Sequence, residues 1–381
     1  MNKPIVFLHP HFLKPGGASK VVLEQASGLI SKGIDCVIVT TKINPEVTDP
    51  YKNLKIIQLS DLTTGNLFFW LTFPIFFFKL IRTINHINPK IIYCHSLAIY
   101  WGYFYKKTDH KIKLVYYLHD LGLPYTDLKV EIKSLNWFQK NFVGVISPIL
   151  KTLNKNIFAL ADYIVANSKT SADYLFKIYK RKVDAIVWPG VDTNIFKPSK
   201  IKKDYVFTVG RLEKSKNIDK IIRGFSLYRQ NNPKSKTKLL IVGEGVERNN
   251  LLKLTSEEKI EKYVDFLGRK DSKDISKIAS QAKLGIFLGA YETFGIAVAE
   301  SLACGTPVIG INVNGVKEIV SDKMVGKLVD GSSNSVFYAL TNMLSQSKIL
   351  YKMSFNAVTF AKQKLSWSIQ IEKLYNFFVS I

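Results

Sequence analysis

The stretch YETFGIAVAESLACGTPVIG, residues 291–310, contains the pattern from which the fold class follows. An apolar run with helical character, FGIAVAESLAC, leads into a Gly-Thr-Pro turn and then into a strand-like run, TPVIG. Helix, turn and buried strand in this order are typical of α/β proteins. Glu292 and Glu300 interrupt the apolar run, and a carboxylate buried without a partner is costly. The sequence therefore predicts that both glutamates meet hydrogen-bond donors; the alternative is a helix with one capping and one solvated acid.

The same alternation of strand-like and amphipathic segments continues in both directions. In the first half, strand-like runs occupy 4–9, 35–41, 90–96, 113–120, 163–168 and 184–190, and in the second half 205–210, 238–245, 264–268, 284–289 and 306–312. Repeated strand–helix units predict doubly wound parallel sheets, whose ligands bind at the carboxyl ends of the strands. We predict two Rossmann-like domains at 1–190 and 205–365, a Pro- and Lys-rich linker at 191–204, and a final helix at 366–381.

Composition agrees with a folded protein of two domains. The chain has 381 residues, of which 47% are hydrophobic and 22% charged. Its cysteines, Cys36, Cys94 and Cys304, are far apart and show neither disulfide nor metal-ligand spacing, which favours a reducing cytosol. The first residues, MNKPIVFLHPHF, contain too short an apolar run for a signal peptide and fit a first strand better.

The formal net charge of +24 predicts an anionic partner: nucleic acid, anionic lipid or a phosphorylated substrate. The excess is shared between the two halves of the chain and is not confined to a tail. No helix-turn-helix, RNP-like or zinc pattern supports nucleic-acid binding.

An aromatic segment, LFFWLTFPIFFFKLI at 67–81, lies within a stretch, 62–108, that has no Asp or Glu. Pro74 and the short length argue against a membrane span. Two interpretations remain: a buried helix or hairpin, or an element that enters the membrane interface with basic residues beside it. On the second, an exposed patch comprises Phe68, Phe69, Trp70, Phe73, Phe76, Phe77 and Phe78.

Two loops have the composition of anion-binding sites. Arg211 directly follows the strand-like run 205–210, and Lys216 lies in the same loop, so both cations suit a diphosphate. Gly16 and Gly17 stand between the first strand and the first helix, where backbone N–H groups approach an anion. The alternatives are a solvated basic loop, which also contains Lys214, and a simple tight turn.

Taken together, GRLEKSKN, VGEG, FLG, the E-x7-E pair and ACGTPVIG resemble the donor half of family 4 (group 1) retaining glycosyltransferases of the GT-B fold. FLHPHFLKPGGASKVV, YYLHD and ADYIVANS resemble the acceptor half, so the resemblance covers nearly the whole chain. FLHP, PGGA, the CHS and HD strand ends and the aromatic segment are most similar to the dolichol-linked-oligosaccharide α-1,3-mannosyltransferase subgroup.

This resemblance implies a role for each matching residue. Arg211 and Lys216 would bind the donor's pyrophosphate, Glu300 the ribose diol and Glu292 the sugar hydroxyls, while His119 would lie by the sugar and acceptor. The implied catalytic residues are His119, Arg211, Lys216 and Glu292, and the implied donor-binding residues are Gly16, Gly17, Gly243, Arg269, Phe294, Gly295, Ile296 and Glu300.

The resemblance also implies an architecture and an activity. Two Rossmann-like domains, acceptor-binding and nucleotide-sugar-binding, would face each other across a cleft, and the final helix would return to the first domain. The activity would be retaining transfer of a hexose, with mannose favoured, from a GDP- or UDP-linked donor to a glycan or lipid-linked acceptor. Without an Asp-x-Asp motif at a strand end, we expect neither metal nor cofactor. We expect a cytoplasmic protein bound peripherally to an anionic membrane surface on its cytosolic face, and no nucleic acid.

Three alternatives remain: a GT-B nucleotide-binding protein without activity, a basic nucleic-acid-binding protein, and a GT-B enzyme outside glycan assembly, such as a sucrose or trehalose synthase.

Two departures from the family pattern bear on the identity of the donor sugar. LGAYE (288–292) stands where the family has Pro-Ser before the first glutamate, and Asn314-Gly315 replaces a Gly-Gly pair.

Overall fold

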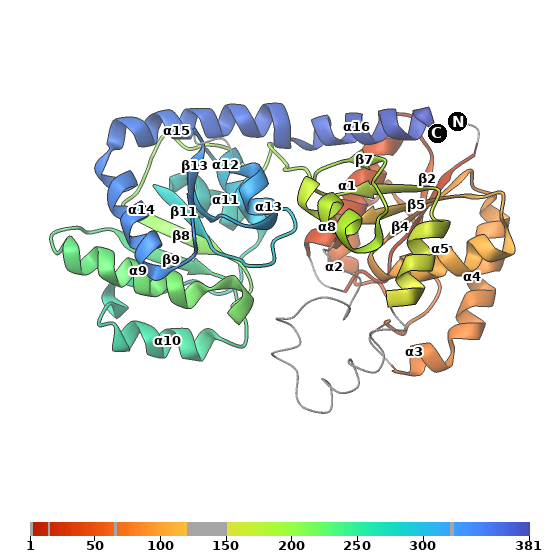
Figure 1. Ribbon diagram of the computed structural model, residues 1–381, viewed down its shortest axis with the longest axis horizontal. Coiled ribbons are helices and arrows are strands. Elements are labelled where there is room, and N and C mark those ends of the chain that lie inside the picture. Colours follow the sequence, from red (N-terminus) through yellow and green to blue (C-terminus); the bar gives the residue numbers. More distant parts are fainter. Residues whose placement is uncertain (1–2, 14–15, 65–66, 120–150, 321–323) are drawn as a thin grey trace. The chain divides into compact units, whose positions relative to one another are not determined.

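The protein consists of two compact α/β units (Figure 1). The computed structural model describes residues 3–13, 16–64, 67–119, 151–320 and 324–381. Unit 1 comprises Met1–Trp188 together with Ile371–Ile381, and unit 2 comprises Pro189–Gln370.

Unit 1 is built on a parallel sheet that has seven strands among the described residues, in the order β3-β2-β1-β4-β5-β6-β7. The strands are β1 (Ile5–Leu8), β2 (Cys36–Thr40), β3 (Lys55–Gln58), β4 (Ile91–His95), β5 (Lys113–Leu118), β6 (Tyr163–Ala166) and β7 (Ala185–Ile186). Ile5 pairs with Cys36 on one side and with Ile91 on the other. The strand order therefore reverses beside β1, between β1 and β4.

Helices cover both faces of this sheet because nearly every residue of the central strands is buried. The described helices are α1 (Gly17–Ser31), α2 (Pro45–Thr48), α3 (Leu67–Leu71), α4 (Phe73–Ile87), α5 (Ile99–Thr108), α8 (Lys169–Tyr179) and α16 (Trp367–Ser380), and residues 151–160 are also helical. Side chains of α4 and α5, including Leu80 and Trp101, form one cluster with Val6, Ile92 and Leu114.

Unit 2 repeats this plan with a parallel sheet of six described strands, in the order β10-β9-β8-β11-β12-β13. The strands are β8 (Tyr205–Val209), β9 (Lys238–Val242), β10 (Val264–Phe266), β11 (Leu284–Phe287), β12 (Val308–Ile311) and β13 (Gly326–Val329). Its described helices are α9 (Ile218–Asn231), α10 (Arg248–Glu257), α11 (Ser272–Gln281), α12 (Ile296–Ala303), α13 (Asn314–Ile319), α14 (Ser333–Ser345) and α15 (Ser347–Phe360). Here the order reverses between β8 and β11, which are neighbours in the sheet.

The predicted fold class, two Rossmann-like domains with doubly wound parallel sheets, is confirmed. The stretch 191–204, predicted as a linker, packs with unit 2: Val191 forms a bridge with Ser366, and Phe196 is buried. Its Pro and Lys residues carry no apolar periodicity, so the sequence pattern did not reveal these contacts.

The final helix returns to unit 1, as predicted from the resemblance. In α16, Ile371, Leu374 and Phe378 lie on one buried face, and the Phe378 ring meets Tyr93 edge-on at 5.0 Å between centroids. Helix α1 has Gly28 at the contact, where a Cβ would stand 2.5 Å from the Ile371 side chain. The close approach of α16 to α1 therefore depends on a glycine.

The aromatic segment divides between the two interpretations. Phe69 and Phe76 are buried in the core of unit 1, and Phe73 and Phe77 pack against that core. Assigning these four residues to an exposed patch was therefore wrong, because the rings form edge and stacked contacts with one another and with α5. Two residues of the predicted patch, Phe68 and Phe78, are exposed, as are Leu71 and Ile75 beside them. The side chain of Trp70, also predicted for this patch, lies outside the described residues.

We predict that Phe378→Ala lowers the free energy of unfolding of unit 1 by about 3–5 kcal/mol, because it leaves a cavity against Tyr93. The matched control is Val379→Ala, since Val379 is 56% exposed and its loss should cost under about 0.5 kcal/mol. Urea unfolding of both variants checks the difference. Equal stabilities would show that α16 contributes little to this core.

Candidate active site

In unit 2, an ion pair joins the two loops that follow β8 and β11. The Lys216 ammonium pairs with the Glu292 carboxylate, and the two side chains keep 24% and 28% exposure. Both loops leave the carboxyl ends of neighbouring strands at the reversal of strand order, where open α/β sheets bind ligands. The pair thus gives Glu292 the partner that its apolar surroundings require, and both groups remain within reach of a ligand.

Arg211 lies in the same loop but more openly. Its guanidinium donates to Glu213 at 2.6 Å, and the Arg211 side chain is 73% exposed. A surface pair of this kind contributes little to stability, so it leaves Arg211 free to reorient toward a stronger anion.

Backbone and amide contacts fix these loops to one another. Ala290 N–H donates to the Ser215 carbonyl at 3.0 Å, and the Asn217 side-chain amide donates to the Leu288 carbonyl at 2.8 Å. The Asn314 amide donates to the Ala290 carbonyl at 2.6 Å. Lys216 and Glu292 are therefore held by a connected set of loops, not by their own charges alone.

Asn314-Gly315 stands where the family has a Gly-Gly pair, and both residues fit the backbone conformation and the space at this turn. Asn314 adopts a left-handed conformation with φ of 51°, which asparagine tolerates better than most residues. Gly315 admits no side chain, because a Cβ would lie 2.3 Å from the Thr293 carbonyl oxygen. Asparagine thus replaces glycine at the position where backbone conformation matters, and glycine remains where space matters.

Helix α12 begins beside this pair. Gly295, with φ of 93°, precedes the first helical residue, Ile296, and Phe294 is buried beneath it. Glu300 lies in the second turn of α12 and is partly buried. The first N–H groups of this helix have no intrahelical acceptors, which suits an anion or an oxygen-rich ligand.

Gly243 and Arg269 lie at the ends of the next two strands. Gly243 has φ of 135°, and a Cβ there would stand 1.9 Å from the Gly210 carbonyl oxygen. Only glycine therefore fits at position 243, because the loops after β8 and β9 contact each other there. Arg269 is exposed after β10.

In unit 1, three neighbouring strands each lead into a buried histidine. His9 follows β1, His95 ends β4 and His119 follows β5, and the three are 4%, 0% and 7% exposed. His95 Nδ1 and His119 Nε2 lie 2.8 Å apart. The Asn167 amide donates to the His119 backbone carbonyl at 2.7 Å. His119 is thus held through its ring and through its backbone.

Burial keeps these imidazoles neutral. Loss of hydration lowers the pKa of His119 to about 3. The pKa values of His9 and His95 fall well below 6.5, first because of burial and then because each ring lies near His119. A charged imidazolium is therefore excluded from this edge of the sheet near neutral pH.

A hollow of about 380 Å³ opens where α1 begins, next to Gly16 and Gly17. His9, His11, Ser19 and Ser96 line it, together with Pro10, Leu13, Ala18 and Leu97. Ser19 Oγ lies 3.4 Å from His9 Nε2. Gly16 is the N-cap residue of α1 and has no side chain that could accept a hydrogen bond from the first N–H groups of the helix.

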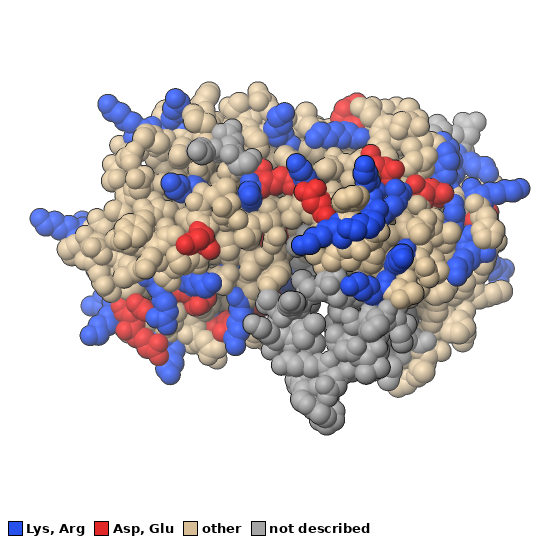
Figure 2. All heavy atoms as spheres, in the orientation of Figure 1, with Lys and Arg blue, Asp and Glu red and all other residues tan. Residues whose placement is uncertain are grey.

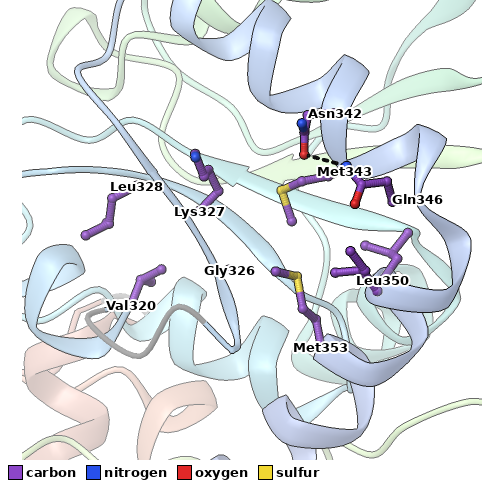
Figure 3. A pocket seen from close by; sticks show the side chains of 10 residues that line it. Val320, Gly326, Lys327, Leu328, Asn342, Met343, Gln346, Leu350 and Met353 are labelled. Atoms are coloured by element: carbon purple, nitrogen blue, oxygen red, sulfur yellow. Dashed lines mark hydrogen bonds between the residues drawn. The ribbon is translucent and has the colours of Figure 1, made fainter.

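A second hollow, of about 400 Å³, lies in unit 2 between β13, α14 and α15 (Figure 3). Val320, Leu328, Met343, Leu350 and Met353 line it, and Gln346 donates to Asn342 at its edge. None of the predicted site residues contributes to this lining.

Within the described residues, no cluster of three or more His, Cys, Asp or Glu side chains is arranged to hold a metal ion. Among the described residues, no helix combines the length and the hydrophobicity that a transmembrane span requires. Lys and Arg side chains are spread over the visible surface of both units (Figure 2).

Both halves of the chain match known glycosyltransferase domains. Residues 15–195 match the model of Glycosyltransferase Family 4, and residues 191–357 match that of Glycosyl transferases group 1. Among solved structures, Anabaena Alr3699/HepE in complex with UDP has a TM-score of 0.78 at 18% identity, covering 99% of this chain and 100% of its own. Sucrose-phosphate synthase from Thermosynechococcus elongatus has a TM-score of 0.80 at 19% identity, covering 100% and 99%.

Fold and family matches together define a glycosyltransferase with the GT-B fold. More narrowly, the matches of its two halves place the chain among the family 4, group 1 glycosyltransferases. It is 26% identical over 375 residues, 95% of each chain, to the N-acetylgalactosamine-N,N'-diacetylbacillosaminyl-diphospho-undecaprenol 4-alpha-N-acetylgalactosaminyltransferase of Campylobacter jejuni. It is 30% identical over 209 residues to the D-inositol 3-phosphate glycosyltransferase of Salinispora arenicola, spanning 48% of this chain and 47% of that relative.

Sequence reasoning named His119 but missed His9 and His95, and it missed Asn217 as a residue that fixes the loops. A signal for the histidines was present, since FLH, YCH and YLH are three apolar runs that each end in histidine. Asn217 carried no signal, because its role depends on contact with a loop distant in sequence.

We predict that acid destabilises unit 1. Below a pH of about 6.5 the unfolded chain protonates His9, His95 and His119, whereas the fold keeps His119 neutral until about pH 3. The free energy of unfolding therefore falls as the pH drops through this window, by at most about 1.4 kcal/mol per pH unit for each ring. Urea unfolding at about pH 7 and about pH 5 measures the slope. Stability that is constant between these values would contradict the neutral burial of the rings.

Proposed function

We propose that the protein catalyses retaining transfer of a hexose unit from a nucleoside diphosphate sugar to a lipid-linked glycan. The observation that carries this proposal is the Lys216–Glu292 ion pair at the reversal of strand order in unit 2. It sets a cation that neutralises a departing diphosphate beside a carboxylate that accepts hydrogen bonds from sugar hydroxyls.

On the donor side, Arg211 and Lys216 bind the diphosphate, and the backbone N–H groups of Phe294, Gly295 and Ile296 add uncharged donors. Glu300, in the second turn of α12, accepts hydrogen bonds from the ribose diol. Gly243 keeps the neighbouring loop close enough for backbone contact, and Arg269 adds a further cation.

In unit 1, Gly16 and Gly17 offer the uncapped start of α1 to a phosphate of the donor. His119 contacts the sugar and the acceptor hydroxyl. As a neutral ring with a strongly lowered pKa, it serves as a hydrogen-bonding group and not as a cation.

In the reaction, the bond from the sugar's anomeric carbon to the phosphate oxygen breaks through an oxocarbenium-like transition state. The acceptor oxygen bonds to the same face of that carbon, and its proton passes to the departing phosphate. Arg211 and Lys216 stabilise the negative charge that develops on the diphosphate, without a divalent metal. Glu292 and Glu300 are binding groups in this scheme, not a paired-carboxylate double displacement.

Two sugars are candidates for the transferred hexose. The resemblance to the mannosyltransferase subgroup favours mannose, whereas the relative from Campylobacter jejuni is named as an N-acetylgalactosaminyltransferase that acts on a diphospho-undecaprenol acceptor, and the solved structure from Anabaena contains UDP. The lipid-diphosphate acceptor of that relative supports a lipid-linked acceptor here.

The test is a thermal-shift screen of GDP-, UDP- and ADP-sugars, followed by a transfer assay with the best donor and a lipid-diphosphate glycan, with and without chelator. We expect one nucleotide class to stabilise the protein and to support transfer with retention at the anomeric carbon. Nucleotide binding without transfer to any glycan acceptor would refute the proposal, and so would an inverted product.

We predict that Lys216→Ala lowers kcat/KM by roughly 30- to 1,000-fold, equivalent to about 2–4 kcal/mol of transition-state stabilisation. Lys214→Ala is the matched control, because Lys214 is an exposed lysine in the same helical turn, Lys214–Lys216, and lacks the contact with Glu292. It should retain activity within about threefold. Similar losses in both variants would indicate a general charge effect of the loop instead.

The exposed side of α3 and α4 is the proposed contact with a membrane surface. Phe68, Leu71, Ile75 and Phe78 are each 63–68% exposed, and Lys79 and Arg82 are exposed beside them. Aromatic and basic side chains together favour the head-group region of an anionic leaflet. This surface would hold the enzyme at the cytosolic face, where a lipid-linked acceptor is reached.

We predict that the triple variant Phe68→Ser, Ile75→Ser and Phe78→Ser remains folded but no longer sediments with anionic liposomes, because these side chains are exposed. Phe76→Ser is the contrasting variant, since Phe76 is 4% exposed and its loss should destabilise the protein by about 3–5 kcal/mol. Undiminished liposome binding by the folded triple variant would exclude this surface as the membrane contact.

A further inference from the structure

The hydrogen bond between His95 and His119 couples the proton positions of the two rings. The contacting atoms, His95 Nδ1 and His119 Nε2, lie 2.8 Å apart in a buried site. Burial keeps both imidazoles neutral, so each ring has one N–H. One of the two contacting nitrogens must therefore carry hydrogen and the other must be bare.

The second nitrogen of His95 decides which arrangement costs less. His95 Nε2 is buried and has no hydrogen-bond partner among the described residues. A buried N–H without an acceptor is rarer in proteins than an under-used acceptor. The favoured form of His95 therefore has a bare Nε2 and carries its hydrogen on Nδ1, which donates to His119 Nε2.

Packing keeps the His95 ring in this orientation. The ring stacks on Phe7 with 5.6 Å between ring centroids and an interplanar angle of 12°. Its centroid lies 4.5 Å from that of the Tyr93 ring and 5.3 Å from that of the Tyr117 ring. These three aromatic side chains are fully buried, so the ring has little room to rotate.

The consequence for His119 follows from its accepting role. With Nε2 occupied by the His95 hydrogen bond, the single hydrogen of a neutral His119 must lie on Nδ1. His119 also retains 7% exposure, and its backbone carbonyl is bound by the Asn167 amide. The outward function of the ring is then that of a rigid N–H donor.

We propose that His95 is a positioning residue that fixes His119 as the Nδ1–H tautomer, so that His119 donates a hydrogen bond to a sugar or phosphate oxygen. A ring in this state has no free lone pair with which to remove a proton from the acceptor. The acceptor proton therefore goes to the departing phosphate, in agreement with the retaining scheme. Only this ligand contact rests on the proposed function, because the tautomer itself is a property of the protein without substrate.

The first test is a long-range proton–nitrogen NMR correlation on protein labelled with ¹⁵N-histidine, near pH 7.5. We expect His119 to show a protonated Nδ1 and a bare Nε2, while the exposed His86 and His110 provide references for solvated rings. A protonated Nε2 on His119 in the unsubstituted protein would overturn the proposal. This readout needs no activity, so it decides the inference even if no donor is turned over.

The second test compares two substitutions. His95→Phe keeps an aromatic ring but removes the donor, so His119 should move toward the Nε2–H form, and kcat should fall about 10- to 100-fold with KM changed under threefold. His95→Gln can donate from its amide and should recover most of the turnover. If His95→Phe fails to fold, the His119 tautomer of the unsubstituted protein, measured in the first test, still decides the inference. A folded His95→Phe variant with normal turnover, or with an unchanged His119 tautomer, would refute the positioning role.

Discussion

The reversal of strand order beside the first strand of each sheet is the constraint on which the rest of the structure depends. The connections that follow β1 and β4 leave toward opposite sides of their sheet, and so do those that follow β8 and β11. No crossover therefore covers the carboxyl ends of these strands. Polar side chains placed there find partners on the neighbouring strand end instead of water alone. The histidines of unit 1 and the Lys216–Glu292 pair of unit 2 occupy equivalent positions in this sense.

Much of this arrangement was accessible from the sequence because it is local. Apolar runs of strand length, glycines at turns and the E-x7-E spacing predicted the sheets, the start of α12 and the individual residues Lys216 and Glu292. Their pairing was not accessible, because it joins positions 76 residues apart and depends on strand order. The same limit applies to Asn217, whose amide reaches a carbonyl on another loop.

The aromatic segment shows a different limit of sequence reasoning. Phe68 and Phe69 are adjacent and chemically identical, yet one is 66% exposed and the other is fully buried. A run of phenylalanines carries no polar contrast from which the buried face of a helix can be assigned. Only the position of α5, whose Trp101 contacts Phe69 and Phe76, decides which rings enter the core.

The return of α16 to unit 1 has a consequence for biosynthesis. Unit 1 is discontinuous in sequence, since its last segment, Ile371–Ile381, follows the whole of unit 2. During translation, the surfaces around Gly28 and Tyr93 that receive Ile371 and Phe378 stay uncovered until residues 371–381 have been synthesised and have left the ribosome. Unit 2 is contiguous and is free to fold earlier. The core of unit 1 is therefore completed only after the whole of unit 2 has been synthesised, although its sheet comes first in the chain.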